Sequence, residues 1–403
     1  MSESPTGVRA EFSAWFAENW DQDLSLTEWR ERLVGSGWGR PSWPSAWYGR
    51  DLPPALDDVI EQELRRCGAV GLAFGPATLL AGPTLIAHGS DALKSRLLRP
   101  MLLGDERWCQ LFSEPEAGSD LASLKTRAVR DGDRWVINGQ KLWSSSANHA
   151  ERGMLLARTG PPDSRREGIT FFAVDLRQPG VEVRPIRQMN GHASFNEVFL
   201  TDVLAVDEEV VGEVDGGWAV ARTTLAHERR LNVAKHLAAK HARGRVIDEA
   251  RIEGREAMAP YRWYPQRSGR PDLLVEAARA AGRASDPVVR QEVAKVFCLA
   301  RCAEWTAARA RAGRAAGRPP GPEGSIGKLQ GSLIARAAAQ AHSLIAGMSG
   351  LATEKGPGHR GVVAEILTSV PAISIAGGTD EIQKNIIGER ILGLPREPSA
   401  LES

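Results

Sequence analysis

One charged run in the sequence begins like a metal-binding helix. In the zinc motif two histidines one turn apart bind the metal, and the glutamate after the first histidine activates water. The run His227-Glu228-Arg229-Arg230-Leu231 supplies the first histidine and the glutamate, but leucine stands where the second histidine is needed. We therefore expect no metal here. On its own, the run is typical of a solvent-exposed helix surface on which Glu228 balances the neighbouring arginines.

Three further segments come close to nucleotide or nucleophile motifs without matching them. Gly35, Gly37 and Gly39 lack the spacing of a dinucleotide-binding loop and follow no expected strand. Residues 321–329 (GPEGSIGKL) are spaced one residue too long for a phosphate-binding loop, and residues 347–351 (GMSGL) miss the nucleophile elbow by one residue. The sequence therefore indicates neither a P-loop enzyme nor a serine hydrolase.

Five other segments, in chain order, match one known family. They are residues 111–122 (LFSEPEAGSDLA), 136–145 (VINGQKLWSS), 189–203 (MNGHASFNEVFLTDV), 216–229 (GGWAVARTTLAHER) and 375–397 (IAGGTDEIQKNIIGERILGLPRE). Together they resemble the acyl-CoA dehydrogenase family, and the N-terminal stretches GWGRPSWPSAWYGRD and HGSDALKSRLLRPMLLGDERW extend the resemblance over nearly the whole chain. The stretches ASDPVVRQ and GPEGSIGKL resemble an actinobacterial branch, several of whose members act on bulky steroid or polyketide CoA thioesters.

The resemblance implies an FAD enzyme that removes two hydrogens from an acyl-CoA or acyl-carrier-protein thioester, as in fatty acid beta-oxidation. The product is a trans-2-enoyl thioester, and electron-transfer flavoprotein is the implied electron acceptor. In this chemistry a carboxylate abstracts the proton alpha to the carbonyl while flavin N5 accepts the beta hydrogen as hydride. Base, substrate and flavin ring must therefore lie in one stack, and their positioning supplies much of the rate.

The same resemblance assigns residues of the middle segments to cofactor and substrate. It implies that Leu111 and Ser113 lie along one edge of the isoalloxazine, with the Ser113 hydroxyl on the pyrimidine side. Trp143 packs by the ring on the other edge and Ser145 lies near N5. For the two serines the alternative is strand packing and local turn hydrogen bonds. Ser119 resembles the position that hydrogen-bonds the pantetheine arm.

C-terminal residues match positions that line the adenine and phosphate parts of FAD in the family, where helix-end amides suit anionic oxygens. They are Gly347, Gly350, Thr379 and Gln383. The family's Arg-x-x-Phe-Gly segment, whose arginine reaches the FAD diphosphate of a neighbouring subunit, has no counterpart in residues 277–296. Arg283 or Arg290 is the expected substitute.

The catalytic base is the most informative position. Family members place a glutamate either immediately before the C-terminal Gly-Thr motif or in the long helix after the Gly-Gly-Trp segment. The first position is Gly377 in this chain, which cannot take a proton, and the second is Glu228. We therefore expect Glu228 to be the general base, with its pKa raised when water leaves the closed site. Arg229 is expected to contact CoA, and the Gly377 N–H to polarise the thioester oxygen.

Two other functions remain open from the sequence. Gly377 and the altered arginine segment are compatible with a catalytically silent subunit of a hetero-oligomeric acyl-CoA dehydrogenase. A flavin oxidase or monooxygenase of secondary metabolism on the same fold is the third hypothesis. The resemblance implies a homodimer or tetramer, with an unlike subunit as the alternative.

The elements that must hold these residues follow from local patterns. Helical periodicity is expected up to about residue 108, and again over 218–251, 287–316, 325–346 and 380–392, with irregular connections over 254–282 and 312–324. Strands are expected at 154–158, 169–175, 181–186 and 195–200, and Asp131-Gly132 and Asn138-Gly139 are typical of hairpin turns. We expect an α+β, acyl-CoA dehydrogenase-like fold. Its expected domains are an N-terminal all-α domain (1–108), a middle β-barrel or sandwich domain (109–215) and a C-terminal four-helix bundle (216–403).

Composition sets the class of protein. The 403 residues are 42% hydrophobic and carry a formal net charge of +1, which predicts a folded protein whose main partner is neither nucleic acid nor an anionic membrane. Residues 68–87 carry no charge, but glycines and prolines interrupt them, so buried short helices are expected rather than a membrane span. Four cysteines without a CxxC pair predict reduced thiols in the core. With no secretion signal in MSESPTGVRAEF, we expect a cytoplasmic protein.

Overall fold

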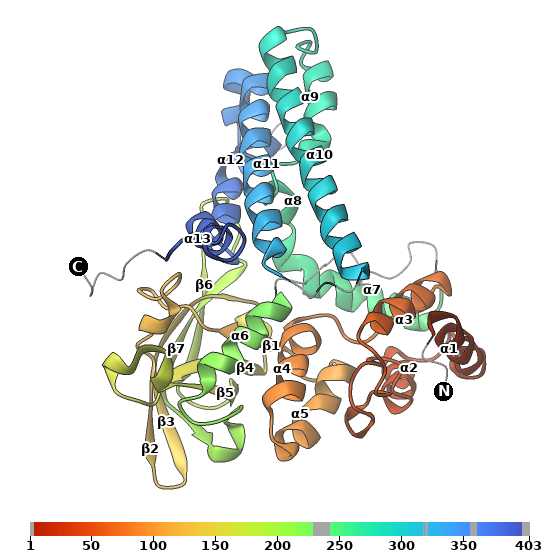
Figure 1. Ribbon diagram of the computed structural model, residues 1–403, viewed down its shortest axis with the longest axis vertical. Helices are drawn as coiled ribbons and strands as arrows, with labels where there is room; N and C mark the ends of the chain where they lie inside the picture. Colours follow the sequence, from red (N-terminus) through yellow and green to blue (C-terminus); the bar gives the residue numbers. More distant parts are fainter. Residues whose placement is uncertain (1–3, 229–241, 317, 319–320, 355–360, 397–403) are drawn as a thin grey trace. The chain divides into compact units, whose positions relative to one another are not determined.

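The computed structural model describes residues 4–228, 242–316, 318, 321–354 and 361–396. The chain forms two compact units, Met1–Arg187 with Ala193–Pro260, and Gln188–His192 with Tyr261–Ser403. The expected order of helices, then strands, then helices along the chain is confirmed (Figure 1).

The first unit begins with helices whose ends follow local signals. α2 (Leu26–Gly35) begins with a capping box, in which the side chains of Ser25 and Glu28 accept hydrogen bonds from each other's backbone N–H groups. α5 (Asp91–Leu103) ends at Gly104, whose φ of +94° favours glycine. The other helical elements before the sheet are α1 (Pro5–Asn19), η1 (Ser45–Trp47), α3 (Ala55–Arg66), the π-helical turn η2 (Ala77–Ala81) and α4 (Gly82–His88).

A seven-stranded sheet follows, in the order β1-β4-β2-β3-β7-β6, with β5 paired to β4. The strands are β1 (Trp108–Leu111), β2 (Arg127–Asp131), β3 (Arg134–Ser145), β4 (Arg152–Arg158), β5 (Ile169–Asp175), β6 (Val181–Ile186) and β7 (Phe195–Val206). Short 3-10 turns connect them at η3 (Leu121–Ser123), η4 (Ala147–His149), η5 (Pro162–Gly168) and η6 (Asp207–Glu209). β5 and β6 have the expected bounds, whereas β4 begins earlier and β7 ends later than expected.

The expected turn at Asn138-Gly139 is wrong, whereas that at Asp131-Gly132 lies between β2 and β3. Asn138 and Gly139 lie inside β3, opposite a bulge in β7 where two residues face Asn138 alone. The Asn138 amide and carbonyl oxygen bond the side chain and the backbone N–H of Asp202, each at 3.0 Å. Gly139 approaches Thr126 so closely that a side chain there would collide with it. This Asn-Gly pair therefore serves a bulge and a close approach of two segments.

Helices and sheet of the first unit share one core, in which Met101 of α5 and Phe171 of β5 are buried together. α6 (Gly217–Glu228) follows the sheet and packs on β5 and on α4. The hydroxyl groups of Thr84 in α4 and Thr224 in α6 lie 3.0 Å apart and are buried. The sheet and the N-terminal helices thus hold α6 between them.

The helix expected over 218–251 is not continuous. Residues 229–241 lie outside the described part of the chain, and residues 242–244 are not helical. α7 (Arg245–Met258) begins only after Gly244, whose φ of +121° favours glycine and interrupts a helix.

The second unit is helical, and its two long helices α10 and α11 lie side by side (Figure 1). Its elements are α8 (Tyr264–Arg267), η9 (Pro271–Leu273), α9 (Leu274–Ala280), α10 (Pro287–Ala315), α11 (Glu323–Ala346), η10 (Gly347–Leu351), α12 (Val362–Ser369), η11 (Val370–Ser374) and α13 (Asp380–Arg390); η8 (Ala259–Tyr261) precedes them. The helices expected over 287–316, 325–346 and 380–392 are confirmed. The connection expected over 254–282 is largely helical, because α9 buries Leu274 and Ala278 against α10 and α11.

The apolar residues 68–87 contain only the short helices η2 and α4, as expected, and none of the described helices is long and apolar enough to span a membrane. The expectation of core thiols holds for one cysteine. Cys109 is buried, Cys67 is half-buried, and Cys298 and Cys302 are exposed on α10.

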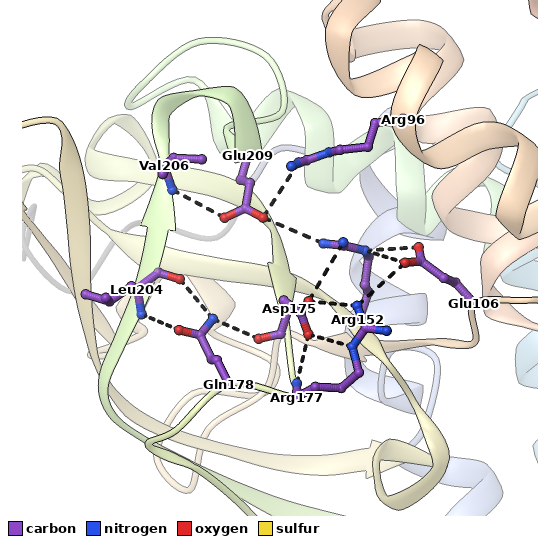
Figure 2. Close-up of polar contacts among 9 residues, drawn as sticks. All are labelled: Arg96, Glu106, Arg152, Asp175, Arg177, Gln178, Leu204, Val206 and Glu209. Carbon is purple, nitrogen blue, oxygen red and sulfur yellow. Dashed lines mark hydrogen bonds and ion pairs between the residues drawn. The ribbon is translucent and has the colours of Figure 1, made fainter.

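A partly buried ionic network joins the ends of β4 and β5 to α5 (Figure 2). The Arg152 guanidinium donates to Glu106 at 3.0 Å and lies 3.6 Å from Glu209 and 3.9 Å from Asp175. Burial raises the pKa of Glu209, although Arg96 and Arg152 counteract the rise. Arg152 is therefore the shared cation of a cluster of carboxylates.

Replacing that cation is expected to destabilise the first unit strongly. Arg152→Met leaves three carboxylates without their common partner, so we expect a loss of about 3 kcal/mol in the free energy of unfolding. The loss should be smaller at pH 5 than at pH 8, because protonation of Glu209, whose pKa is raised, relieves the repulsion. Urea unfolding at both pH values measures it. Arg130→Met, which breaks an exposed pair with Asp207, should change little; equal effects of the two variants would contradict the prediction.

Candidate functional site

Two of the expected cofactor-binding segments lie next to each other in the β domain. Ser113 follows β1, and its carbonyl accepts a hydrogen bond from the backbone N–H of Leu142 in β3 at 2.8 Å. Ser113 is half-buried, so its hydroxyl group lies near the surface. The side chain of Leu111 is fully buried in the core of the sheet, which leaves only its backbone for a cofactor contact.

Trp143 stands out on the neighbouring strand. It lies in a bulge of β3, where Leu142 and Trp143 together face one residue of β7. Its φ is +60°, a conformation that costs a bulky residue about 1–3 kcal/mol and that concentrates at functional sites. The indole is 54% exposed and touches the ring of Phe195 edge-on at 5.8 Å. A large aromatic ring is therefore held at the surface at an energetic cost, which suits a ring that packs on a ligand.

Two serines follow Trp143 in β3. Ser145 is half-buried at the end of β3, whereas Ser144 is buried and its hydroxyl has no hydrogen-bond partner among the described residues. Ser119, the expected pantetheine contact, is exposed in the loop between β1 and β2. Asp120 beside it forms an ion pair with Arg165 at 3.0 Å. The loop therefore presents a hydroxyl group to solvent from an anchored backbone.

The same two motif segments contribute a buried ion pair to which the sequence patterns assigned no role. The Nζ of Lys141, which is fully buried, donates to Oε1 of Glu114 at 2.8 Å. Burial alone would raise the pKa of Glu114, but the charge and hydrogen bond of Lys141 and two backbone N–H donors hold it below its ordinary value. Burial lowers the pKa of Lys141 to about 8, which leaves the pair ionised at neutral pH.

A signal for this pair is present in the sequence. Trp135, Ile137 and Lys141 occupy alternate positions of β3, and all three are buried. Alternation places them on one face of the strand, so a lysine in phase with buried apolar residues requires a buried partner. The partner itself, Glu114, lies far along the chain and is not marked by any periodicity.

Glu228 is the last described residue of α6 and is half-buried. It follows Thr224 and Ala221 by one and two helical turns, so it shares their face of the helix. Both residues are fully buried, and Thr224 faces α4 through Thr84. Glu228 therefore does not belong to a fully solvent-exposed surface, as the charged run alone indicated. Arg229, the expected CoA contact, lies outside the described residues.

In the second unit, Gly377 begins a turn that leads into α13. Its φ is +70°, and an added Cβ would meet only Lys328, at 4.0 Å. There is thus space beside Gly377, but the backbone conformation disfavours a glutamate at this position. The side-chain amide of Gln383 donates to the carbonyls of Gly377 and Gly378 at 3.2 and 3.3 Å, and the Thr379 side chain accepts from the backbone N–H of Ile382. These two side chains hold the turn, and Gln383 is buried.

The other expected FAD contacts of this unit lie apart from that turn. Gly347, with φ +54°, ends α11, and Gly350 is buried three residues later. Arg283 donates to the carbonyl of Leu344 and pairs with Asp286, so it joins the start of α10 to the end of α11. Arg290 is exposed on α10. Of the two arginines, Arg290 has the less constrained guanidinium.

The expected site residues thus fall into separate groups. The structure brings Ser113 together with the bulge at Trp143, and Gly377 together with Thr379 and Gln383. Glu228 belongs to the first unit and Gly377 to the second. The donor set in the β domain fits a flat heteroaromatic cofactor, because serine hydroxyls and an exposed indole suit a polar-edged ring.

Comparison with known proteins gives a single family. Three domain models match in chain order: "Acyl-CoA dehydrogenase, N-terminal domain" over residues 8–105, "middle domain" over 109–203 and "C-terminal domain" over 272–392. The fold of that family is an N-terminal helical domain, a middle β domain that forms a half-barrel and a C-terminal helical domain, which confirms the expected fold class.

Two curated relatives of this chain belong to the same family. The chain is 35% identical to acyl-CoA dehydrogenase FadE34 of Mycobacterium tuberculosis over 97% of its own length, although it spans only 49% of FadE34. It is 35% identical to acyl-CoA dehydrogenase IpdE1 of the same organism, over 92% of this chain and 88% of IpdE1. Among solved structures, the Tcur3481-Tcur3483 steroid ACAD is similar, with a TM-score of 0.67, 25% identity, and coverage of 98% of this chain and 100% of that one.

Proposed function

Because the chain belongs to the acyl-CoA dehydrogenase family, we propose that it oxidises an acyl thioester to the trans-2-enoyl thioester with FAD as its cofactor. Members of the family typically bind FAD. The observation that supports this function most is the position of Glu228, a half-buried carboxylate on the face of α6 that also carries the buried Thr224. Electron-transfer flavoprotein is the proposed acceptor of the electrons.

In this proposal Glu228 removes the alpha proton of the substrate, and the Gly377 N–H donates to the thioester oxygen, where negative charge develops. Bound FAD supplies the hydride acceptor. Trp143 packs beside its ring, while Ser113 and Ser145 donate hydrogen bonds to the ring edges.

The remaining assignments concern the ends of cofactor and substrate. Ser119 and Arg229 bind the CoA arm, and Gly347, Gly350, Thr379 and Gln383 hold the adenine and phosphates of FAD. Arg290 supplies the diphosphate contact, because Arg283 already joins α10 to α11. A bulky CoA thioester is the proposed substrate class, since one similar solved structure is a steroid ACAD.

Anaerobic titration with a panel of acyl-CoAs tests the reaction and the substrate class together. The protein should purify yellow, and its flavin absorbance should bleach at stoichiometric thioester. Bleaching should be at least about tenfold faster with a steroid side-chain CoA than with butyryl-CoA if the substrate is bulky. A protein that takes up no FAD, or whose flavin no thioester bleaches, would contradict the proposed activity.

Gly377 favours a second candidate, a catalytically silent subunit of a hetero-oligomer, because it supplies no carboxylate at one of the two base positions. In that case thioesters should leave the flavin oxidised even after co-expression with an active family member. Glu228 argues for the active enzyme, and the titration decides between the two.

The outer face of α10 supports a proposal about assembly. Homologous acyl-CoA dehydrogenases form homo- or hetero-oligomers. On the side of α10 away from α11, exposed small and apolar residues form a stripe that the exposed Arg301 interrupts: Ala294, Phe297, Cys298, Trp305 and Ala308. Such a stripe is typical of a helix that packs on another helix. We take its partner to be a second copy of this chain in a homodimer or tetramer.

A further inference from the structure

We propose that Glu114 and Lys141 are positioning residues. Their buried ion pair fixes three backbone segments relative to one another: the first flavin-flanking segment (residues 111–113), the second flavin-flanking segment (residues 143–145) and the loop that carries Ser119. The inference rests on the proposed flavin site. It concerns two side chains that lie beneath that site and touch the backbone of each segment that forms it.

Lys141 connects the first flanking segment to the second. Its Nζ donates to the carbonyl of Phe112 at 3.2 Å as well as to Glu114. The next residue of β3, Leu142, donates its backbone N–H to the carbonyl of Ser113 at 2.8 Å. Consecutive residues of β3 therefore bond consecutive carbonyls of the first segment. This arrangement specifies how the Ser113 hydroxyl lies relative to Trp143.

Glu114, which pairs with Lys141, connects the first flavin-flanking segment to the loop that carries Ser119. Its carboxylate accepts from the backbone N–H groups of Lys125 at 2.6 Å and Thr126 at 2.9 Å. The loop from Glu114 to Thr126 is thus closed at its two ends by one side chain. A second buried charge secures the far half of this loop, since Arg158 donates to the carbonyls of Ala122 and Leu124 at 2.7 and 3.1 Å.

The pair also explains how Trp143 stays in its unfavourable backbone conformation. A residue with positive φ persists only where its surroundings over-determine it. Lys141, two residues before Trp143, is anchored to the first segment, and the carbonyl of Ser144, the residue after it, accepts from the Asn196 amide at 2.9 Å. The backbone of Trp143 is therefore held on both sides, at Lys141 and at Ser144. Loss of the Lys141 anchor releases the first of these two attachments.

A buried ion pair adds little net stability over two apolar side chains, because both charges must leave water. The pair instead supplies direction, because its two side chains make three hydrogen bonds to named backbone groups, to the N–H groups of Lys125 and Thr126 and to the carbonyl of Phe112, which apolar side chains cannot make. Stability and positioning can therefore be separated by experiment. Removing both charges should restore much of the stability that removing one destroys, without restoring the register.

The test compares Lys141→Met, the double variant Glu114→Gln with Lys141→Met, and the matched variant Glu106→Gln. Glu106 is also a carboxylate in an ion pair of this unit, but its partner is Arg152 (Figure 2). For each protein, thermal unfolding of the flavin-free form gives Tm, and fluorescence titration with FAD gives Kd together with the bound-flavin absorption spectrum. The wild-type protein tests the proposed function itself. A wild-type protein that binds no FAD would refute that function, and with it the positioning role of the ion pair.

We expect Lys141→Met to lower Tm and to raise the Kd for FAD. The double variant should recover most of the Tm, yet keep a Kd at least about tenfold above wild type and a shifted flavin spectrum, because the Phe112 carbonyl has lost the Lys141 donor and Trp143 is held from one side only. Glu106→Gln should lower Tm without changing Kd. A double variant with wild-type Kd and spectrum would overturn the proposal and leave a purely structural pair.

A measurement on the wild-type protein needs no variant to fold. Because burial lowers the pKa of Lys141 to about 8, Lys141 loses its positive charge on alkaline titration and leaves the buried Glu114 carboxylate without its cation. The Kd for FAD should therefore rise severalfold between pH 7 and pH 9.5, and this rise should be absent in the double variant. A Kd that changes equally with pH in both proteins would count against the proposal.

Discussion

Glu228→Gln should leave FAD bound and slow anaerobic reduction of the flavin by about three orders of magnitude or more. The amide has nearly the same shape as the carboxylate but cannot accept the alpha proton. Glu228 lies in line with Ala221 and Thr224, which are buried, so the neutral amide should be tolerated by the packing of α6. Stopped-flow absorbance of the yellow protein, mixed with saturating thioester, measures the rate.

The matched control is Glu213→Gln, in the exposed segment before α6. It changes the charge of the same region equally and should reduce flavin at the wild-type rate. If Glu228→Gln still reduces the flavin at the wild-type rate, Glu228 is not the general base. Equal slowing of flavin reduction in both variants would show that the rate depends on the net charge of this region and not on a proton acceptor at Glu228.

Trp305→Glu should dissociate the proposed assembly. The indole is 65% exposed and Phe297, two turns earlier, is 54% exposed on the same side of α10. A carboxylate there would place a charge in the helix–helix contact, and the contact of a large aromatic ring would be lost. We expect the subunit dissociation constant to rise by about 100-fold or more. Sedimentation velocity over a range of protein concentrations measures the change.

Val129→Glu provides the control, because Val129 is an exposed apolar residue on β2, outside the α10 stripe. It should leave the assembly intact. If the wild-type chain is monomeric alone but assembles when an unlike family member is co-expressed, the partner of α10 is a different subunit and not a second copy of this chain. A wild-type oligomer that Trp305→Glu leaves unchanged would contradict the role of α10.

The segments of the candidate site are visible in the sequence, but most of the contacts that hold them are not. The motif segments around Ser113, Trp143 and Gly377 are short and continuous, so each is visible without knowledge of the fold. Their neighbours are not. Nothing local marks Glu114 as the partner of Lys141, or gives Arg283 its contact with the Leu344 carbonyl, because both bonds join residues distant in the chain.

The sequence by itself determined the order of helices and strands, the bounds of β5 and β6, and the bounds of α10 to within one residue. These depend on periodicity and on side chains within a few residues of each other. Tertiary structure alone decided that Asn138-Gly139 forms no turn, since Asp202 of β7 and Thr126 meet it across the sheet. It also decided that Glu228 shares a buried helix face, because burial of a charged helix depends on which surfaces pack against it.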